Sequence, residues 1–156
     1  MSLLKICQYL EEEGVRFSLI RHAPAYSAQK TAAAARIPGR EVAKVVIVMM
    51  DGNLAMAVIP ADHHVDLAQL GEATGAEEVG LASEWEFKDR FPDCELGAMP
   101  PFGNRYNLPV YVAAPLTQGE YIAFHAGNYS QLVRLKYADF SRMVQPRVLN
   151  IALHRV

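Results

Sequence analysis

Apolar residues in this chain recur in two patterns, one spaced for helices and one continuous, as in buried strands. Near the start, apolar positions close to the helical period predict a helix over residues 3–13, and a second helix is expected at 137–144. Shorter helices are expected after Ser27, Asp62 and Ser83, because each of these side chains can cap a helix N-terminus. The helices are therefore short and dispersed along the chain.

Continuous apolar runs indicate the strands. The runs at 45–50 and 54–60 are joined by Asp51-Gly52-Asn53, and Asp-Gly between apolar runs is a strong hairpin signal. Because the two runs are continuous rather than alternating, both faces of the hairpin are expected to be covered. Further strands are expected at residues 15–20, 110–114, 121–126 and 130–135. Strands interspersed with short helices favour an α+β domain with an antiparallel or mixed sheet.

Length and composition limit the class of protein. The chain has 156 residues, which suits a single domain over 1–156, and 51% of them are hydrophobic. No apolar run approaches the roughly 18 residues of a membrane span, and the first residues do not resemble a secretory signal. A cytoplasmic location without membrane contact is the default, so Cys7 and Cys94 are expected to be free thiols.

Charge is unevenly distributed along the chain, although the net charge is only −2. Residues 21–44 carry five Lys or Arg against one acid, and 134–156 carry five against one. Residues 51–95 carry eleven acids against two cations. If the two basic segments meet in space, they form a patch for phosphates; otherwise they are ordinary solvated faces.

Three segments carry candidate chemistry, and each has an ordinary structural alternative. Lys44 opens an apolar strand, where it either extends to solvent or holds a carbonyl or phosphate oxygen. The stiff Gly97–Gly103 loop is either a rigid connector or a source of backbone N–H groups for an oxyanion. His125, at a strand end, is either structural or a base or hydrogen-bonding group, and Asn128 after it either supplies a turn or contacts substrate.

Several common mechanisms are not supported. His63 and His64 are adjacent, so their side chains point in different directions and cannot readily chelate one ion together. The sequence contains no Walker loop, no GxGxxG and no GxSxG motif. We therefore expect no metal, no cofactor, no use of ATP and no serine nucleophile.

Taken together and in order, the motifs resemble one family. They are Arg21-His22-Ala23-Pro24-Ala25-Tyr26, Glu41-Val42-Ala43-Lys44-Val45-Val46, the run from Asn53 to Pro60, Gly97-Ala98-Met99-Pro100-Pro101-Phe102-Gly103, and Phe124-His125-Ala126-Gly127. This order is similar to the YbaK/ProX family, also called the prolyl-tRNA synthetase insertion-domain superfamily. The resemblance runs from about residue 22 to 140, and its individual motifs are weak when taken alone.

The resemblance implies a fold, an activity and a set of site residues. The fold would be a mixed, partly closed, barrel-like β-sheet wrapped by short helices, and the activity hydrolysis of mischarged aminoacyl-tRNA in trans. The amino acid removed would be small, such as Ala, Cys or Ser, and the partner the tRNA 3′ end. The family's lysine and GxxxP motif map to Lys44 and Gly97 as catalytic residues. Substrate-binding residues would be His22, Tyr26, Pro101, Phe102, Gly103, His125, Gly127 and Asn128.

The implied mechanism leaves some points open. Water would be the nucleophile, with Tyr26 or Phe102 stacking on a base of the single-stranded end. The general base could be His125, the tRNA ribose or Lys44 itself. The alternatives are a non-catalytic module that binds aminoacyl-tRNA or a small molecule, and a hydrolase of small esters. The sequence does not decide whether an aminoacyl-tRNA synthetase is needed as a partner.

Overall fold

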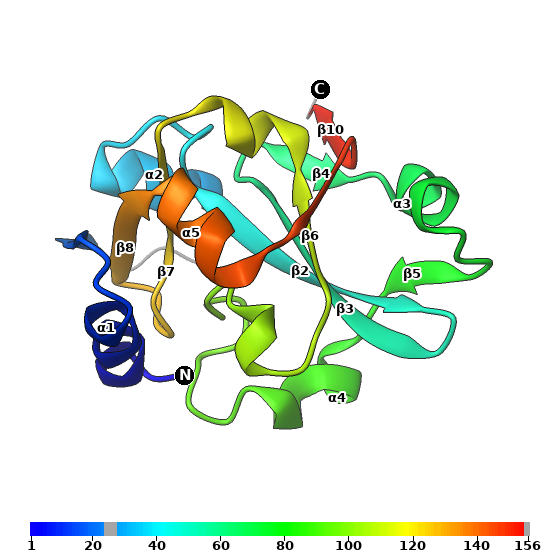
Figure 1. Ribbon diagram of the computed structural model, residues 1–156, viewed down its shortest axis with the longest axis horizontal. Helices are drawn as coiled ribbons and strands as arrows, with labels where there is room; N and C mark the ends of the chain where they lie inside the picture. Colours follow the sequence, from blue (N-terminus) through cyan, green and yellow to red (C-terminus); the bar gives the residue numbers. More distant parts are fainter. Residues whose placement is uncertain (24–27, 155–156) are drawn as a thin grey trace.

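A central five-stranded sheet forms the middle of the molecule (Figure 1). The computed structural model describes residues 1–23 and 28–154. The order of the central sheet is β5-β2-β3-β6-β9, antiparallel from β5 to β3 and parallel from β3 to β9. Its strands are β2 (Ala43–Met50), β3 (Asn53–Pro60), β5 (Val79–Leu81), β6 (Val110–Ala113) and β9 (Arg147–Leu149).

Two smaller antiparallel sheets, five α-helices and three short 3₁₀ helices complete the described part of the chain. One sheet has the order β1-β8-β7 and the other pairs β10 with β4. These strands are β1 (Phe17–Arg21), β4 (His63–Val65), β7 (Tyr121–His125), β8 (Gln131–Lys136) and β10 (Ala152–His154). The helices are α1 (Leu3–Glu12), α2 (Ala28–Ala35), α3 (Leu67–Thr74), α4 (Glu84–Phe87) and α5 (Tyr137–Val144).

The predicted hairpin is confirmed. Met50 pairs with Asn53, and Asp51 and Gly52 both have positive φ, at 49° and 83°. Such a pair of left-handed residues is typical of the type I′ turn that matches strand twist. Alternate residues of β2 and β3 belong to two apolar clusters on opposite sides of the sheet, so both faces are covered as expected.

Of the helices expected at a capping side chain, the one at Ser83 begins as predicted and the one at Asp62 does not. Ser83 and Glu86 form the expected capping box at the start of α4. The helix expected after Asp62 begins later, because Asp66 caps α3 and His63–Val65 is strand β4. That prediction was wrong since β10, from the other end of the chain, pairs with these residues.

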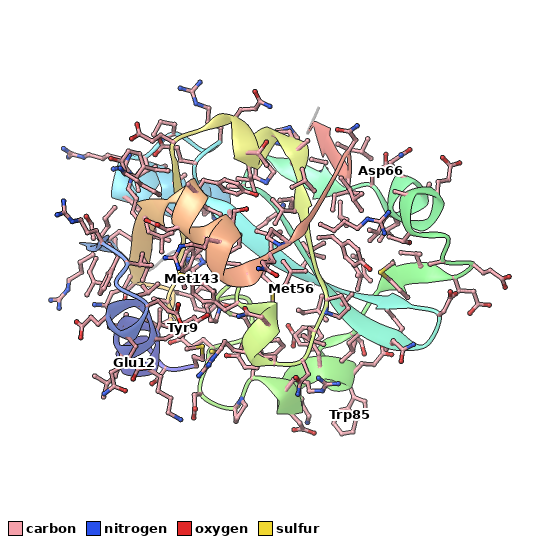
Figure 2. The ribbon with its side chains drawn as sticks, in the orientation of Figure 1. Tyr9, Glu12, Met56, Asp66, Trp85 and Met143 are labelled. Carbon is pink, nitrogen blue, oxygen red and sulfur yellow. The ribbon has the colours of Figure 1, made fainter. Side chains whose placement is uncertain are left out.

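The main core lies between the central sheet, the β1-β8-β7 sheet and helices α1 and α5. At its centre the Phe102 ring contacts Tyr9 at 5.6 Å, Phe124 at 5.3 Å and Phe140 at 5.9 Å between centroids. Figure 2 shows Tyr9 on α1 near this interior, whereas Trp85 on α4 points away from the molecule and is 78% exposed. Edge and tilted ring contacts of this kind add to the burial energy of the rings.

Within the described residues, one backbone bridge joins the two larger sheets. Val42, just before β2, forms a parallel bridge with Ala123 of β7. The Ala123 N–H donates to the Glu41 carbonyl at 2.9 Å, and the Ala61 N–H donates to the Val42 carbonyl at 2.8 Å. The middle of β7 is therefore held against the residues that lead into β2.

The α+β class with a mixed sheet is confirmed, but the expected barrel-like closure is not. The strands in residues 1–23 and 28–154 form separate sheets that meet at the Val42–Ala123 bridge and do not close into a barrel. The edge strands β5 and β9 are short, and each pairs on one side alone. In the described part of the chain, no helix combines the length and the apolar character required to cross a membrane.

We expect Phe102→Ala to lower the free energy of unfolding by about 3–5 kcal/mol, because it removes the ring at the centre of this cluster. The measurement is denaturant unfolding at constant temperature. Trp85→Ala is the matched control, and since Trp85 is exposed its change should stay within about 0.5 kcal/mol. Equal losses in both variants would contradict the assignment of Phe102 to the core.

Candidate functional site

Lys44 lies on the same side of the joined sheets as His125. Val42 and Ala123 are bridged in parallel, and Lys44 and His125 each follow two residues later. Because side chains alternate along a strand, a step of two residues returns to the same face. Lys44 is half-buried and pairs across the hairpin with Ile59. The register therefore places a cation and an imidazole at neighbouring positions on this face.

His125 is buried and held in its neutral form. Its side chain is 6% exposed, and its Nε2 is hydrogen-bonded to the Thr31 hydroxyl of α2 at 3.1 Å. Burial, reinforced by the nearby His22 ring, lowers the pKa of His125 from 6.5 to about 4. At neutral pH this imidazole carries no charge, so it is a weak base and adds no repulsion to a neighbouring cation.

His22 provides a buried acceptor that is not used. Its ring centroid lies 6.1 Å from that of His125, and its Nδ1 is 2.7 Å from the Ala23 carbonyl oxygen. Since a carbonyl only accepts, Nδ1 carries a proton, and in the neutral ring Nε2 is then an acceptor. Nε2 is fully buried, and no group of residues 1–23 and 28–154 is hydrogen-bonded to it. A buried acceptor without a donor costs about 1–3 kcal/mol, which a ligand hydroxyl could recover.

The Gly97 loop is tied to the turn that follows β7. The Gly127 N–H donates to the Ala98 carbonyl at 3.0 Å, and the Glu95 N–H donates to the Gly127 carbonyl at 2.9 Å. Gly97 has a φ of 89°, and a Cβ added there would lie 2.4 Å from the Tyr129 hydroxyl oxygen. The loop therefore requires glycine both for its backbone conformation and for the close approach of Tyr129.

The Gly97 amide is a donor that a stronger acceptor could take over. Its N–H donates to the Met99 sulfur at 3.1 Å, and a thioether is a weak acceptor. The next amide, of Ala98, is already used in a turn to the Glu95 carbonyl at 3.0 Å. Of these two amides, Gly97 is thus the one suited to bind a developing negative charge.

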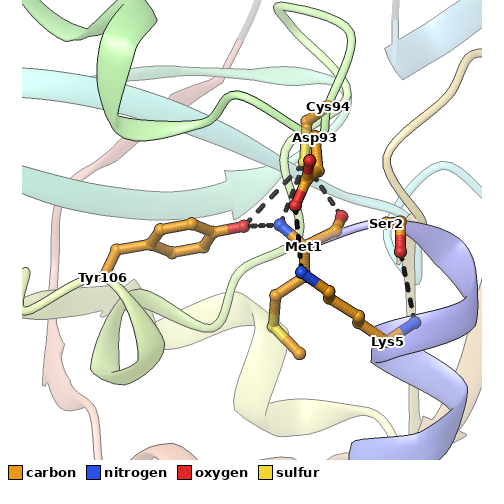
Figure 3. A network of polar contacts seen from close by, with 6 residues as sticks. All are labelled: Met1, Ser2, Lys5, Asp93, Cys94 and Tyr106. Carbon is orange, nitrogen blue, oxygen red and sulfur yellow. Dashed lines mark hydrogen bonds and ion pairs between the residues drawn. The ribbon is translucent and has the colours of Figure 1, made fainter.

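The start of the chain braces the segment that leads into this loop (Figure 3). The Cys94 thiol donates to the Met1 carbonyl oxygen at 3.0 Å, and the Met1 nitrogen donates to the Tyr106 hydroxyl. Lys5 forms an ion pair with Asp93 at 3.3 Å. Burial raises the pKa of the Tyr106 hydroxyl, so it stays protonated. These contacts hold the chain just before Gly97 in place.

Several other residues expected at the site are buried in the core or stabilise a turn. Phe102 is fully buried in the core, and a Cβ on Gly103 would meet Val110 at 2.5 Å, so neither fits the expected contact with a nucleotide. Pro101 is also buried. Asn128 stabilises its own turn, because its Oδ1 accepts from the Ser130 N–H at 3.0 Å. Tyr26 lies outside the described residues.

The structure thus brings together Lys44, His22, His125 and the Gly97–Gly127 pair, and it adds two residues that sequence reasoning missed. Thr31 is fully buried and bonded to His125, and Tyr129 packs its ring against His125 at 5.8 Å. A threonine or a tyrosine does not by itself indicate a functional site in a sequence. A Tyr two residues after a strand-end Gly was the available hint for Tyr129.

The described residues hold no group of three or more His, Cys, Asp or Glu side chains placed to bind a metal ion. The two cysteines are free thiols, as expected.

The two basic segments of the sequence do meet in space. Strand β1 pairs with β8, with Arg21 opposite Gln131 and Ser18 opposite Arg134. Arg134 also forms an ion pair with Glu41 at 3.4 Å. The ion pair between Arg134 and Glu41 therefore brings the start of the second basic segment against the end of the first.

A family model described as the aminoacyl-tRNA editing domain matches residues 22–143. A relative from Escherichia coli (strain K12), the multifunctional Ser/Thr-tRNA deacylase ProXp-y, is 33% identical over 155 residues. The match covers 94% of this chain and 90% of that protein.

Solved structures share the fold. The hypothetical protein APE2540 superposes with a TM-score of 0.85 at 20% identity, covering 96% of this chain and 99% of that one. A crystal structure described as a candidate trans-editing enzyme for prolyl tRNA synthetase gives 0.81 at 17% identity, covering 97% and 96%. At these identities the likeness concerns the fold alone.

We expect Gly97→Ala to destabilise the protein, because alanine is strained at this φ and its Cβ collides with the Tyr129 hydroxyl. Tyr129→Phe removes the colliding oxygen. A double-mutant cycle by denaturant unfolding should show that Gly97→Ala costs at least about 1 kcal/mol less in the Tyr129→Phe background. Additive losses would contradict the close approach of these two residues.

Protonation of His125 should make the protein less stable in acid. Since its pKa is lower in the folded chain, the unfolded chain binds the proton first, and stability falls as pH decreases from 6.5 to about 4. The difference between these two pKa values corresponds to about 3 kcal/mol in the free energy of unfolding. The measurement is the free energy of unfolding against pH for wild type and His125→Gln, and parallel curves over that window would contradict the assignment.

Proposed function

The chain belongs to the aminoacyl-tRNA editing domain family, and from that membership we propose that it hydrolyses the ester between a tRNA and a wrongly attached amino acid. The observation that carries the proposal is the placement of Lys44 beside neutral His125, with the Gly97 loop tied to the turn after the same strand. The substrate is the aminoacylated tRNA 3′ end, and the reaction is ester hydrolysis in trans.

Two groups in this proposal stabilise charge. Water adds to the ester carbonyl carbon, and negative charge develops on the carbonyl oxygen. The Gly97 N–H exchanges its weak bond to the Met99 sulfur for this oxygen, and Lys44 offsets the charge. The ester bond to the ribose oxygen then breaks, and that oxygen takes a proton. One oxyanion donor is typically worth about 10²–10³ in rate.

His125 is proposed to position groups in its neutral form. With a pKa of about 4 it is poorly suited to remove a proton at neutral pH. Its hydrogen bond to Thr31 and its contact with Tyr129 fix the orientation of the ring. The free ribose hydroxyl of the tRNA is then proposed to relay the proton, accepting one from the attacking water while it donates its own to the leaving ribose oxygen.

The amino acids that are removed from tRNA are proposed to be small and, preferably, to carry a side-chain hydroxyl. The relative from Escherichia coli is named for Ser and Thr, and the buried Nε2 of His22 offers an acceptor for a side-chain hydroxyl. A site that satisfies such an acceptor discriminates strongly against substrates lacking the donor. We therefore place Ser and Thr ahead of Ala and Cys.

We expect Lys44→Ala to abolish hydrolysis while the protein remains folded, because the variant removes the cation next to the reacting ester. The measurement is deacylation of a panel of tRNAs charged with Ser, Thr, Ala or Cys, with and without a prolyl-tRNA synthetase. Lys88→Ala, at an exposed cation beside Trp85, is the matched control and should leave rates unchanged.

The same panel separates catalysis from binding alone. Hydrolysis of Ser- or Thr-tRNA that depends on Lys44 supports the proposal. Full activity in Lys44→Ala would overturn the proposed role of the lysine. No turnover of any substrate by wild type, with retained tRNA binding, would favour a non-catalytic aminoacyl-tRNA binding module.

A further inference from the structure

A hollow on the outer face of the β1-β8-β7 sheet is lined by basic side chains. It has a volume of about 570 Å³ and opens to solvent. The residues used here to define it, called the basic groove, are Arg16, Ser18, Tyr121, Arg134, Lys136 and Asp139. The groove is separate from the residues assigned above to ester hydrolysis.

Strand register places the basic groove on the same face as His125. Ser18 of β1, Arg134 of β8 and Ala123 of β7 are opposite one another across the sheet. Lys136 is opposite Tyr121, two residues further along β8. Since two residues of a strand span about 7 Å, the groove begins about 7 Å and ends about 14 Å from His125 along the sheet.

In the part of the chain that the structure describes, the acids near the groove form ion pairs, whereas two of its cations do not. Glu41 accepts from Arg134 at 3.4 Å, and Asp139 lies 3.7 Å from Arg142. Arg134 also lies over the Tyr121 ring, with its Cζ 4.0 Å from the ring centroid, and this contact restrains the guanidinium. Arg16 and Lys136 are exposed at the rim, so their charges give the groove a net positive potential.

Charge is divided between the two ends of the molecule. Strands β1 and β8 lie at the left of Figure 1, together with α2, whose exposed Lys30 and following Arg36 extend the basic side. The acid-rich stretch 51–95 forms the β2–β3 turn, α3 and β5 at the right and α4 below. A polyanion is therefore attracted to one end alone.

We propose that the basic groove binds backbone phosphates of the acceptor arm of the tRNA whose 3′ end occupies the Lys44 site. This inference rests on the proposed function. Helix α2 covers the sheet between His125 and the groove, packing on Ala123 and Leu132, so the RNA passes over α2 rather than along the strands. Phosphate contacts of this kind give affinity without reading sequence.

The test compares Arg16→Gln/Lys136→Gln with the matched pair Lys88→Gln/Arg90→Gln, two exposed cations at the α4 end. Binding of full-length tRNA and the KM for Ser-tRNA are measured across a salt series. Each phosphate contact contributes about 0.9 to the magnitude of the slope of log affinity against log salt. The slope measured for the groove variant should therefore be smaller in magnitude by about 2. Its KM should rise about ten-fold at low salt, with kcat unchanged.

A short aminoacylated oligonucleotide that carries the 3′ end alone separates this inference from the proposed function. Wild type and the groove variant should hydrolyse it equally, because it lacks the phosphates that the groove binds. If the groove variant keeps wild-type slope and KM on full-length tRNA while wild type is active, the groove inference is wrong and the function stands. If wild type hydrolyses neither substrate, the proposed function fails, and an unchanged salt slope for tRNA binding would overturn the groove as well.

Discussion

The arrangement of the candidate site depends on one backbone junction. Where the chain enters β2, the Glu41 carbonyl accepts from Ala123 of β7 and the Val42 carbonyl accepts from Ala61 at the end of β3. The bond from Ala123 crosses between the separate sheets and fixes their register, whereas the bond from Ala61 extends the pairing of β2 with β3. The lysine and the histidine are neighbours because of that register, although 80 residues separate them in the sequence.

The histidines illustrate how the fold retains an unfavourable arrangement at the site. Two buried rings about 6 Å apart cannot both carry charge cheaply, and His125 responds by remaining neutral. Among the described residues, none is hydrogen-bonded to the acceptor that the neutral His22 ring presents at Nε2. Such a cost is maintained only when the surrounding structure is stable enough to bear it, which the four-ring core around Phe102 provides.

Local signals in the sequence predicted local structure well. The Asp51-Gly52 hairpin and the Ser83 capping box appear as expected, because each depends on residues next to one another in the chain. The helix after Asp62 was predicted wrongly because the competing partner, β10, lies some 90 residues away and is only three residues long. Pairing between strands so far apart in the chain leaves no periodic pattern in the sequence from which it could be predicted.

The same distinction holds for the site. Lys44 and Gly97 could be named from motifs, and the structure gives them neighbours consistent with a role. Phe102 was expected to stack on a base because it is aromatic and lies near glycines, yet its environment is the core. Thr31 and Tyr129 acquire their importance from contacts with His125, so the chain order alone could not indicate them.

Strand β1 is the outer strand of its sheet, and its outer backbone groups face no other described strand. An open edge of this kind can pair with the edge of another molecule, and the exposed Leu19 would favour such pairing. Arg16 and Arg21 flank the strand and are exposed. Two copies approaching edge to edge would bring these like charges together, so the cations also discourage self-association. Arg16, which lines the basic groove, would thereby also oppose edge-to-edge pairing of two copies.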